Sequence, residues 1–265
     1  MSFTENAGAR IYWDEKGHGA PLLLIMGLGW ASNMWHGTRE VLAARYRTIT
    51  FDNRGAGRSS VPPAPYSIAQ MASDAAAVLD AAGVGAAHIV GASMGGMIAQ
   101  EFALQYPARV RSLVLACTTP GGHNAVQPDA ATLGALLTTG LSPRERAELM
   151  VPFLYDASTP RPVIDAELAR LSEFYPIPEG FAAQLQAILA WQAYDRLTQI
   201  SAPTLVIHGT NDRLVPAANG ELIASRIPAA KLAMVPSAAH ILFADQPEQS
   251  HRALLDFLSA QAPVS

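Results

Sequence analysis

The stretch Gly91-Ala92-Ser93-Met94-Gly95 decides the fold, because it joins a short apolar segment to an amphipathic one. Residues 87–90 before it are typical of a buried strand, and residues 96–104 carry apolar side chains on one face of a helix. We therefore expect Ser93 on a tight turn in a strained backbone conformation. Side chains in place of the two glycines would clash with the neighbouring strand and helix. The pattern predicts that the Ser93 hydroxyl is exposed above the edge of a sheet.

Two later segments place an aspartate and a histidine in similar positions. Asp212 follows the apolar residues 203–207, and His240 follows residues 231–235. Because each lies past the C-terminal end of an expected strand, a parallel sheet would bring Ser93, Asp212 and His240 to one edge. Gly-x-Ser-x-Gly also occurs in ordinary glycine-rich turns, and the other two residues could be a turn cap and a surface residue. The three types together favour nucleophilic catalysis, because serine needs an imidazole to take its proton and the imidazole needs an orienting carboxylate.

Apolar and helical segments alternate along most of the chain. This alternation predicts an α/β fold with a mostly parallel central sheet and helices on both faces. The expected strands are residues 22–25, 48–51, 88–90, 113–115, 205–207 and 232–235. One expected helix runs from Tyr66 to Ala82 and ends at Gly83. The length of 265 residues fits a single domain, residues 1–265.

The alternation is interrupted at about residues 121–202, which we call the cap segment. Its prolines and apolar residues predict four helices, at about 129–139, 143–155, 161–174 and 179–197. The cap segment carries more apolar side chains than a small helical layer buries by itself. Some are therefore expected to line a roof over Ser93, with Phe153 and Trp191 as pocket candidates. In the alternative interpretation, they only pack the cap segment against the core.

The chain resembles the α/β-hydrolase family over nearly its whole length. It shares the Gly-x-Ser-x-Gly turn and the chain order Ser, Asp, His, and residues 51–59 match the Asp-x-Arg-Gly-x-Gly-x-Ser loop of that family. The resemblance implies that Ser93 is the nucleophile, His240 the base and Asp212 the orienting acid. It also implies a helical cap inserted after the sixth strand of the family.

The resemblance further implies two backbone donors for an oxyanion, the N–H groups of Leu28 and Met94. The family often carries His-Gly where this chain has Met26-Gly27. Because the donors are backbone groups, an apolar side chain at that position is compatible with activity. Gly27 and Trp30 of the same loop are further pocket candidates.

Several other residues are expected to be structural. Asp52 and Arg54 should join loops and not touch substrate. Trp35, on a helix capped by Asn33, is expected in the core, and Cys117 is expected to be a buried spectator at the end of an apolar strand.

Composition and motif content exclude several function classes. The chain has 18 Lys and Arg against 22 Asp and Glu, a net charge of −4, and no basic cluster, so we expect no nucleic-acid partner. No two of the seven histidines have the His-x-x-x-His spacing, and there is one cysteine, so we expect no metal site and interpret His208 as structural. No glycine-rich nucleotide motif is present, which predicts no cofactor. The sequence has neither a signal-peptide pattern nor a membrane-length apolar run, so we expect a soluble, cytoplasmic protein that does not bind membranes.

The resemblance therefore implies a serine hydrolase whose partner is a small-molecule carboxylic ester or lactone, cleaved through an acyl-enzyme. The chain looks most similar to the esterase and enol-lactonase branch. Two alternatives use the same three residues, carbon–carbon bond hydrolysis and cofactor-free perhydrolysis. Another is a ligand receptor that turns over slowly. Haloalkane dehalogenases are disfavoured, because they carry Asp in place of Ser93. The pattern carries no signal for oligomeric state.

Overall fold

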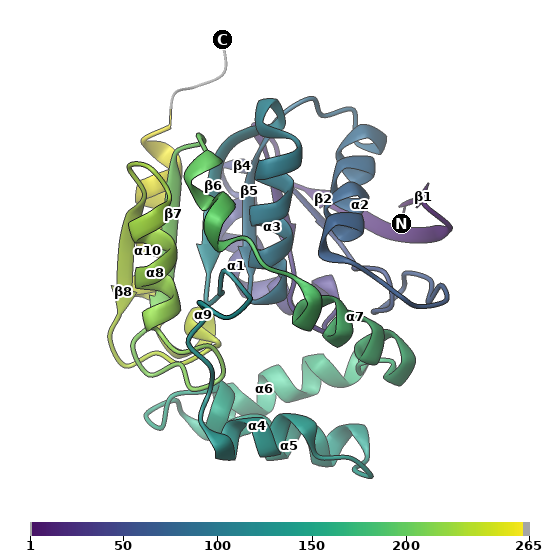
Figure 1. Ribbon diagram of the computed structural model, residues 1–265, viewed down its shortest axis with the longest axis vertical. Coiled ribbons are helices and arrows are strands. Elements are labelled where there is room, and N and C mark those ends of the chain that lie inside the picture. The colour runs from purple at the N-terminus through teal and green to yellow at the C-terminus, as the bar shows by residue number, and fades with distance from the viewer. Residues whose placement is uncertain (1, 262–265) are drawn as a thin grey trace.

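The computed structural model describes residues 2–261 and contains an eight-stranded sheet with the order β1-β2-β4-β3-β5-β6-β7-β8 (Figure 1). The strands are β1 (Ser2–Asn6), β2 (Ala9–Lys16), β3 (Ala20–Ile25), β4 (Tyr46–Phe51), β5 (Ala87–Ala92), β6 (Val110–Ala116), β7 (Thr204–Gly209) and β8 (Lys231–Val235). Strands β3 to β8 pair in parallel, whereas β2 is antiparallel to β1 and β4. The expected α/β fold is confirmed.

Helices cover both faces of this sheet. The α-helices of the described residues are α1 (His36–Ala43), α2 (Ile68–Ala81), α3 (Met94–Gln105), α4 (Ala130–Leu137), α5 (Pro143–Leu154), α6 (Arg161–Leu171), α7 (Pro178–Ala190), α8 (Ala218–Arg226), α9 (Leu242–Asp245) and α10 (Pro247–Ser259), of which α4, α5 and α6 lie off the faces of the sheet. Apolar residues of α2, α3 and α8 pack on one face, and those of α1, α9 and α10 pack on the other. Along β3, Leu23 and Ile25 face the first layer, whereas Leu22 and Leu24 face the second. Both faces of β3 are buried, which is why it reads as a continuous apolar run.

All six expected strands are present, but the sequence analysis missed the N-terminal hairpin of β1 and β2. These strands are partly exposed and carry charged residues, so they lack the apolar run of a buried strand. Ala7 and Gly8 join them, both with positive φ. A glycine between two short alternating segments is the signal that could have predicted the hairpin.

The cap segment forms α4, α5, α6 and α7 between β6 and β7, and the first three lie together at one end of the molecule (Figure 1). The expectation of a helix over 179–197 is wrong, because α7 ends at Ala190. Trp191 is extended, and Gln192 forms a β-bridge with Gly121. The chain is thereby returned to the core before the 3₁₀ turn Tyr194–Gln199.

Asp52 joins two loops, as predicted, whereas the ion pair of Arg54 joins its loop to a helix. Asp52 accepts hydrogen bonds from the backbone and hydroxyl of Ser32 and pairs with Arg58 at 2.7 Å. Arg54 forms a fully buried ion pair with Asp74 at 2.6 Å. The Asp52 bonds fix the loop after β4 against the loop after β3, and the Arg54 pair fixes it against α2.

Trp35 is buried in the core, as expected, but the predicted helix cap is wrong. The Asn33 amide donates to the carbonyl of Arg170 in α6 at 3.0 Å, and α1 begins at His36 without a side-chain cap. Asn33 therefore joins the cap segment to the core. No helix within residues 2–261 is both long enough and apolar enough to cross a membrane.

Candidate active site

Ser93 lies between β5 and α3 with φ of 57° and ψ of −122°. This left-handed conformation is strained for a residue with a side chain. A Cβ on Gly91 would overlap the carbonyl oxygen of Gly95, and a Cβ on Gly95 would overlap that of Ile25 in β3. The close approach of strand and helix therefore requires both glycines, for the reason the sequence predicts.

Asp212 and His240 lie in the loops after β7 and β8, at the same sheet edge as Ser93. His240 Nδ1 and Asp212 Oδ2 are 2.8 Å apart, and both residues are buried. An ionised carboxylate only accepts hydrogen bonds, so Nδ1 is the donor in this contact, and Nε2 is the ring nitrogen that remains for a second partner. The two loops are joined by a bond from Asn211 N to Ala238 O at 2.9 Å.

The Asp212 carboxylate is held by groups on both of its oxygens. Oδ1 accepts from the Val215 amide at 2.8 Å, and Oδ2 lies 3.2 Å from His208 Nε2. Burial opposes ionisation, but the charge of His240 and the hydrogen bonds from His208 and His240 outweigh it, so the pKa of Asp212 is lowered. Asp212 is therefore ionised at neutral pH, and His208 has the structural role that the sequence predicts.

The structure brings Asp212 and His240 into contact but does not join His240 to Ser93. Within residues 2–261, the Ser93 hydroxyl makes no hydrogen bond, although the backbone of Ser93 is held by Ala116 and Thr118. Hydrogen bonds between catalytic groups are often long in a free enzyme and shorten when substrate binds. Among the described residues, the Ser93 hydroxyl thus has no hydrogen-bond partner on the turn.

The two expected oxyanion donors have free N–H groups. Among the described residues, neither the Leu28 nor the Met94 amide donates to a protein acceptor. Met94 opens α3, where the helix dipole favours negative charge. A Cβ on Gly27 would lie 3.1 Å from Ser93 Cβ, so the Leu28 loop passes directly beside Ser93. The arrangement can hold an oxyanion next to Ser93.

The sequence analysis missed two side chains that hold this loop. Asn53 Nδ2 donates to Met26 O at 2.8 Å, and Gln184 Oε1 accepts from Gly29 N at 2.7 Å. Gln184 belongs to α7 and is 155 positions from Gly29. No local pattern indicates a contact over that separation.

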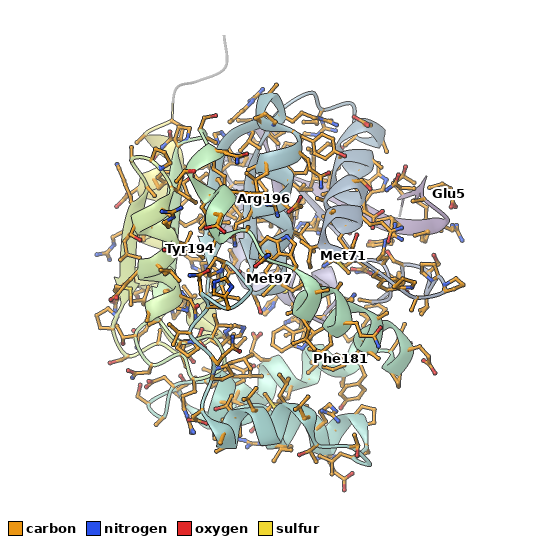
Figure 2. All side chains as sticks on the ribbon, in the orientation of Figure 1. Glu5, Met71, Met97, Phe181, Tyr194 and Arg196 are labelled. Carbon is orange, nitrogen blue, oxygen red and sulfur yellow. The ribbon has the colours of Figure 1, made fainter. Side chains whose placement is uncertain are left out.

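Trp191, a pocket candidate of the sequence analysis, is buried in the core. Its side chain belongs to the core layer of α2 and α3, and the residue is only 7% exposed. The indole nitrogen donates to Glu101 Oε2 at 2.8 Å, and Arg196 pairs with the same carboxylate. Figure 2 labels Arg196 close to α3. These contacts favour a packing role for Trp191.

The other pocket candidates lie on or near the loops that carry the candidate site residues. Trp30 is half-buried and packs against the core layer of α1 and α10. The Arg213 guanidinium lies over the Phe153 ring, 4.8 Å from the centre of that ring. Arg213 directly follows Asp212 in the chain. Phe153 is thus located where the cap segment meets the loop that carries Asp212.

Cys117 follows β6 and is buried. Burial and the nearby charge of Asp212 raise the pKa of its thiol well above the ordinary value. The thiol therefore stays protonated at neutral pH and is a poor nucleophile. Within the part of the chain that the structure describes, no three His, Cys, Asp or Glu side chains are grouped to hold a metal ion.

The profile of the alpha/beta hydrolase fold matches residues 20–247, which include the turn at Ser93 and both loops at Asp212 and His240. The chain belongs to the α/β-hydrolase family. It is 34% identical over 264 residues to RutD of Azorhizobium caulinodans, which is provisionally named a carbamate hydrolase. That match covers 97% of this chain and 98% of the relative.

Two solved structures are also similar over nearly their full length. A thermophilic esterase from Thermogutta terrifontis is 30% identical, with a TM-score of 0.81 and coverage of 97% of this chain and 96% of that chain. Est816, described as an N-acyl homoserine lactone degrading enzyme, is 29% identical, with a TM-score of 0.82 and coverage of 97% and 100%. The family and these relatives identify the chain as a hydrolase similar to the esterase and lactonase branch.

Proposed function

We propose that this chain is a serine hydrolase that cleaves a small carboxylic ester or lactone through an acyl-enzyme. The observation that carries the proposal is the 2.8 Å contact between His240 Nδ1 and the buried Asp212 carboxylate, at the sheet edge where Ser93 leaves β5. A histidine oriented in this way has its Nε2 available to accept a serine proton.

In the proposed reaction, Ser93 Oγ forms a bond to the substrate carbonyl carbon while His240 Nε2 takes the hydroxyl proton. The carbonyl oxygen becomes negative and accepts hydrogen bonds from the Leu28 and Met94 amides. Collapse of this intermediate breaks the bond to the leaving oxygen, which receives the proton from His240. Water, deprotonated by His240, then attacks the acyl carbon. The bond from this carbon to Ser93 Oγ breaks, Ser93 takes the proton from His240, and the acid leaves.

The relatives support the substrate class. One is named an esterase and another degrades a lactone. The same residues serve both substrates, because a lactone differs only in that its leaving oxygen stays attached to the acyl group. The name of the RutD relative adds a carbamate to the compounds worth testing.

A double-mutant cycle tests the mechanism. Because a nucleophile and its base act as a unit, Ser93→Ala and His240→Ala should each lower kcat for p-nitrophenyl acetate by about 10³ or more, and the double variant should lose little further. Asp212→Asn should lower kcat by about 10⁴, because an amide favours the wrong imidazole tautomer. Circular dichroism confirms that each variant is folded. Losses that multiply in the double variant would contradict the mechanism.

A substrate panel tests the class. Aryl esters of increasing acyl length, a series of lactones and an aryl carbamate are compared by kcat/KM, with multiple turnovers expected on esters or lactones. A single turnover would favour the slow receptor. Carbon–carbon bond cleavage or peracid formation that exceeds ester hydrolysis would favour the other two alternatives.

A further inference from the structure

Gln184 belongs to the cap segment, and both ends of its side-chain amide form hydrogen bonds to loops outside the cap segment. It lies in α7 and is 0% exposed. Its Oε1 accepts from Gly29 N and its Nε2 donates to Arg54 O, each at 2.7 Å. The Gly29 N–H can only donate and the Arg54 carbonyl can only accept, so the orientation of the amide is determined.

The loop that receives this contact has weak bonds of its own. Its turn is closed by a bond of 3.4 Å from Trp30 N to Gly27 O. The stronger bonds come from outside the loop, from Asn53 to Met26 at one end and from Gln184 to Gly29 at the other. Leu28, whose N–H is free, lies between these two attachment points.

Helix α7 also packs closely on the same loop. A Cβ on Gly29 would lie 2.8 Å from the Phe181 ring and 3.0 Å from Pro176. Figure 2 labels Phe181 on α7, one turn before Gln184. The cap segment therefore helps to fix the position of the loop.

We propose that Gln184 is a positioning residue for the oxyanion site. By accepting the Gly29 N–H, it orients the adjacent Leu28 N–H toward the carbonyl oxygen that becomes negative beside Ser93. The inference rests on the proposed function. It gives the cap segment a part in the chemical step, in addition to any effect on substrate size.

Gln184→Met tests this role, because methionine has a similar length and neither donates nor accepts a strong hydrogen bond. Removal of an oxyanion donor costs about 10² to 10³ in kcat, so misplacing one should lower kcat by about 10- to 100-fold, with KM changed less than about threefold. A trifluoromethyl ketone, which forms an oxyanion adduct, should lose affinity by the same factor. Gln184→Glu, which keeps an acceptor for Gly29 N–H, should recover part of kcat.

Two controls separate positioning from packing. Gln186 is exposed on the same helix, and Gln100 is a fully buried glutamine in α3 that donates to Gly96 O and Thr119 O. Gln186→Met should behave as the parent, and Gln100→Met should lose stability with kcat within about threefold. A folded Gln184→Met with parental kcat, or with the kinetic profile of Gln100→Met, would overturn the proposal.

Amide hydrogen exchange of Gly29, measured by NMR, gives a readout besides activity. The Gly29 N–H should exchange slowly in the parent and at least about 10-fold faster in Gln184→Met, because its buried acceptor is gone. Equal exchange in the two proteins contradicts the positioning role even if Ser93 is the nucleophile. Faster exchange in a chain that hydrolyses no ester would instead contradict the proposed function.

Discussion

For single residues, the effect of burial on ionisation depends on the partners. Asp212 is buried, yet His240 and His208 lower its pKa, so it stays charged where it can orient His240. His88 in β5 lacks such a carboxylate. Burial and the charge of Arg111 lower the pKa of His88 from 6.5 to about 4, and its Nδ1 lies 2.8 Å from Ser112 Oγ. His88 is therefore neutral in the folded protein.

This shift predicts a pH-dependent stability. The unfolded chain takes up a proton at His88 near pH 6.5, whereas the folded chain does so only near pH 4. The contribution of neutral His88 is complete above pH 6.5 and decreases as the pH falls toward 4. Urea titrations from pH 7.5 to 4.5 should show the free energy of unfolding of the parent decreasing by on the order of 2 kcal/mol more than that of His88→Gln. Parallel curves for the two proteins would show that His88 does not titrate in this way.

At the scale of the element, the end of α7 is decided by a contact with α3. The apolar pattern predicts a helix through residue 197, but the chain leaves the helix at Trp191. There the indole bonds to Glu101, and the following residue pairs with Gly121. Tertiary contacts thus override the helical pattern.

This contact predicts the effect of Trp191→Phe. The variant keeps an aromatic ring and removes the indole N–H, so Glu101 loses one of its hydrogen bonds. The loss should lower the free energy of unfolding by about 1 to 3 kcal/mol, because the acceptor is charged and buried. We expect KM and acyl-length preference to stay within about twofold of the parent. A marked change in chain-length preference, with stability unchanged, would return Trp191 to the substrate pocket.

At the scale of the whole molecule, the cap segment is attached to the loops that carry the site. The Leu154 carbonyl accepts from Ile241 N at 3.0 Å, next to His240. Asp156 accepts from the Asn211 side chain at 2.7 Å, next to Asp212. Gln184 holds the loop after β3, which carries Leu28. Figure 1 shows the helices of this segment gathered at one end of the sheet. The cap segment is thus bonded to all three loops at this edge of the sheet.

Much of the fold was predictable because its signals are local. Most of the six predicted strands are buried apolar runs, whereas the edge strand β8 is partly exposed, and the glycines around Ser93 indicate a close approach that any larger residue would block. The candidate site residues could be predicted in the same way, because Asp212 and His240 lie in the loops just after their strands. The hairpin of β1 and β2 was missed because its exposed strands lack an apolar run.

The contacts of the cap segment were not predictable, for a physical reason. The spacing of apolar or amide side chains along a helix is the same whether they face a pocket, the core or another loop. Trp191 and Gln184 acquire their partners only when α7 packs against α3 and the loop after β3. Such partners depend on the packed structure and not on spacing along the chain.

The most direct test of the central claim is covalent labelling of the nucleophile. A p-nitrophenyl alkylphosphonate should react once per chain, with Ser93 Oγ forming the bond to phosphorus and p-nitrophenolate leaving. Peptide mass spectrometry should find the phosphonyl group on Ser93, and ester hydrolysis should fall in proportion to labelling. His240→Ala should react at least about 100-fold more slowly, because its serine lacks a base. Full labelling at another residue, or a fully labelled Ser93 with parental ester hydrolysis, would contradict the account.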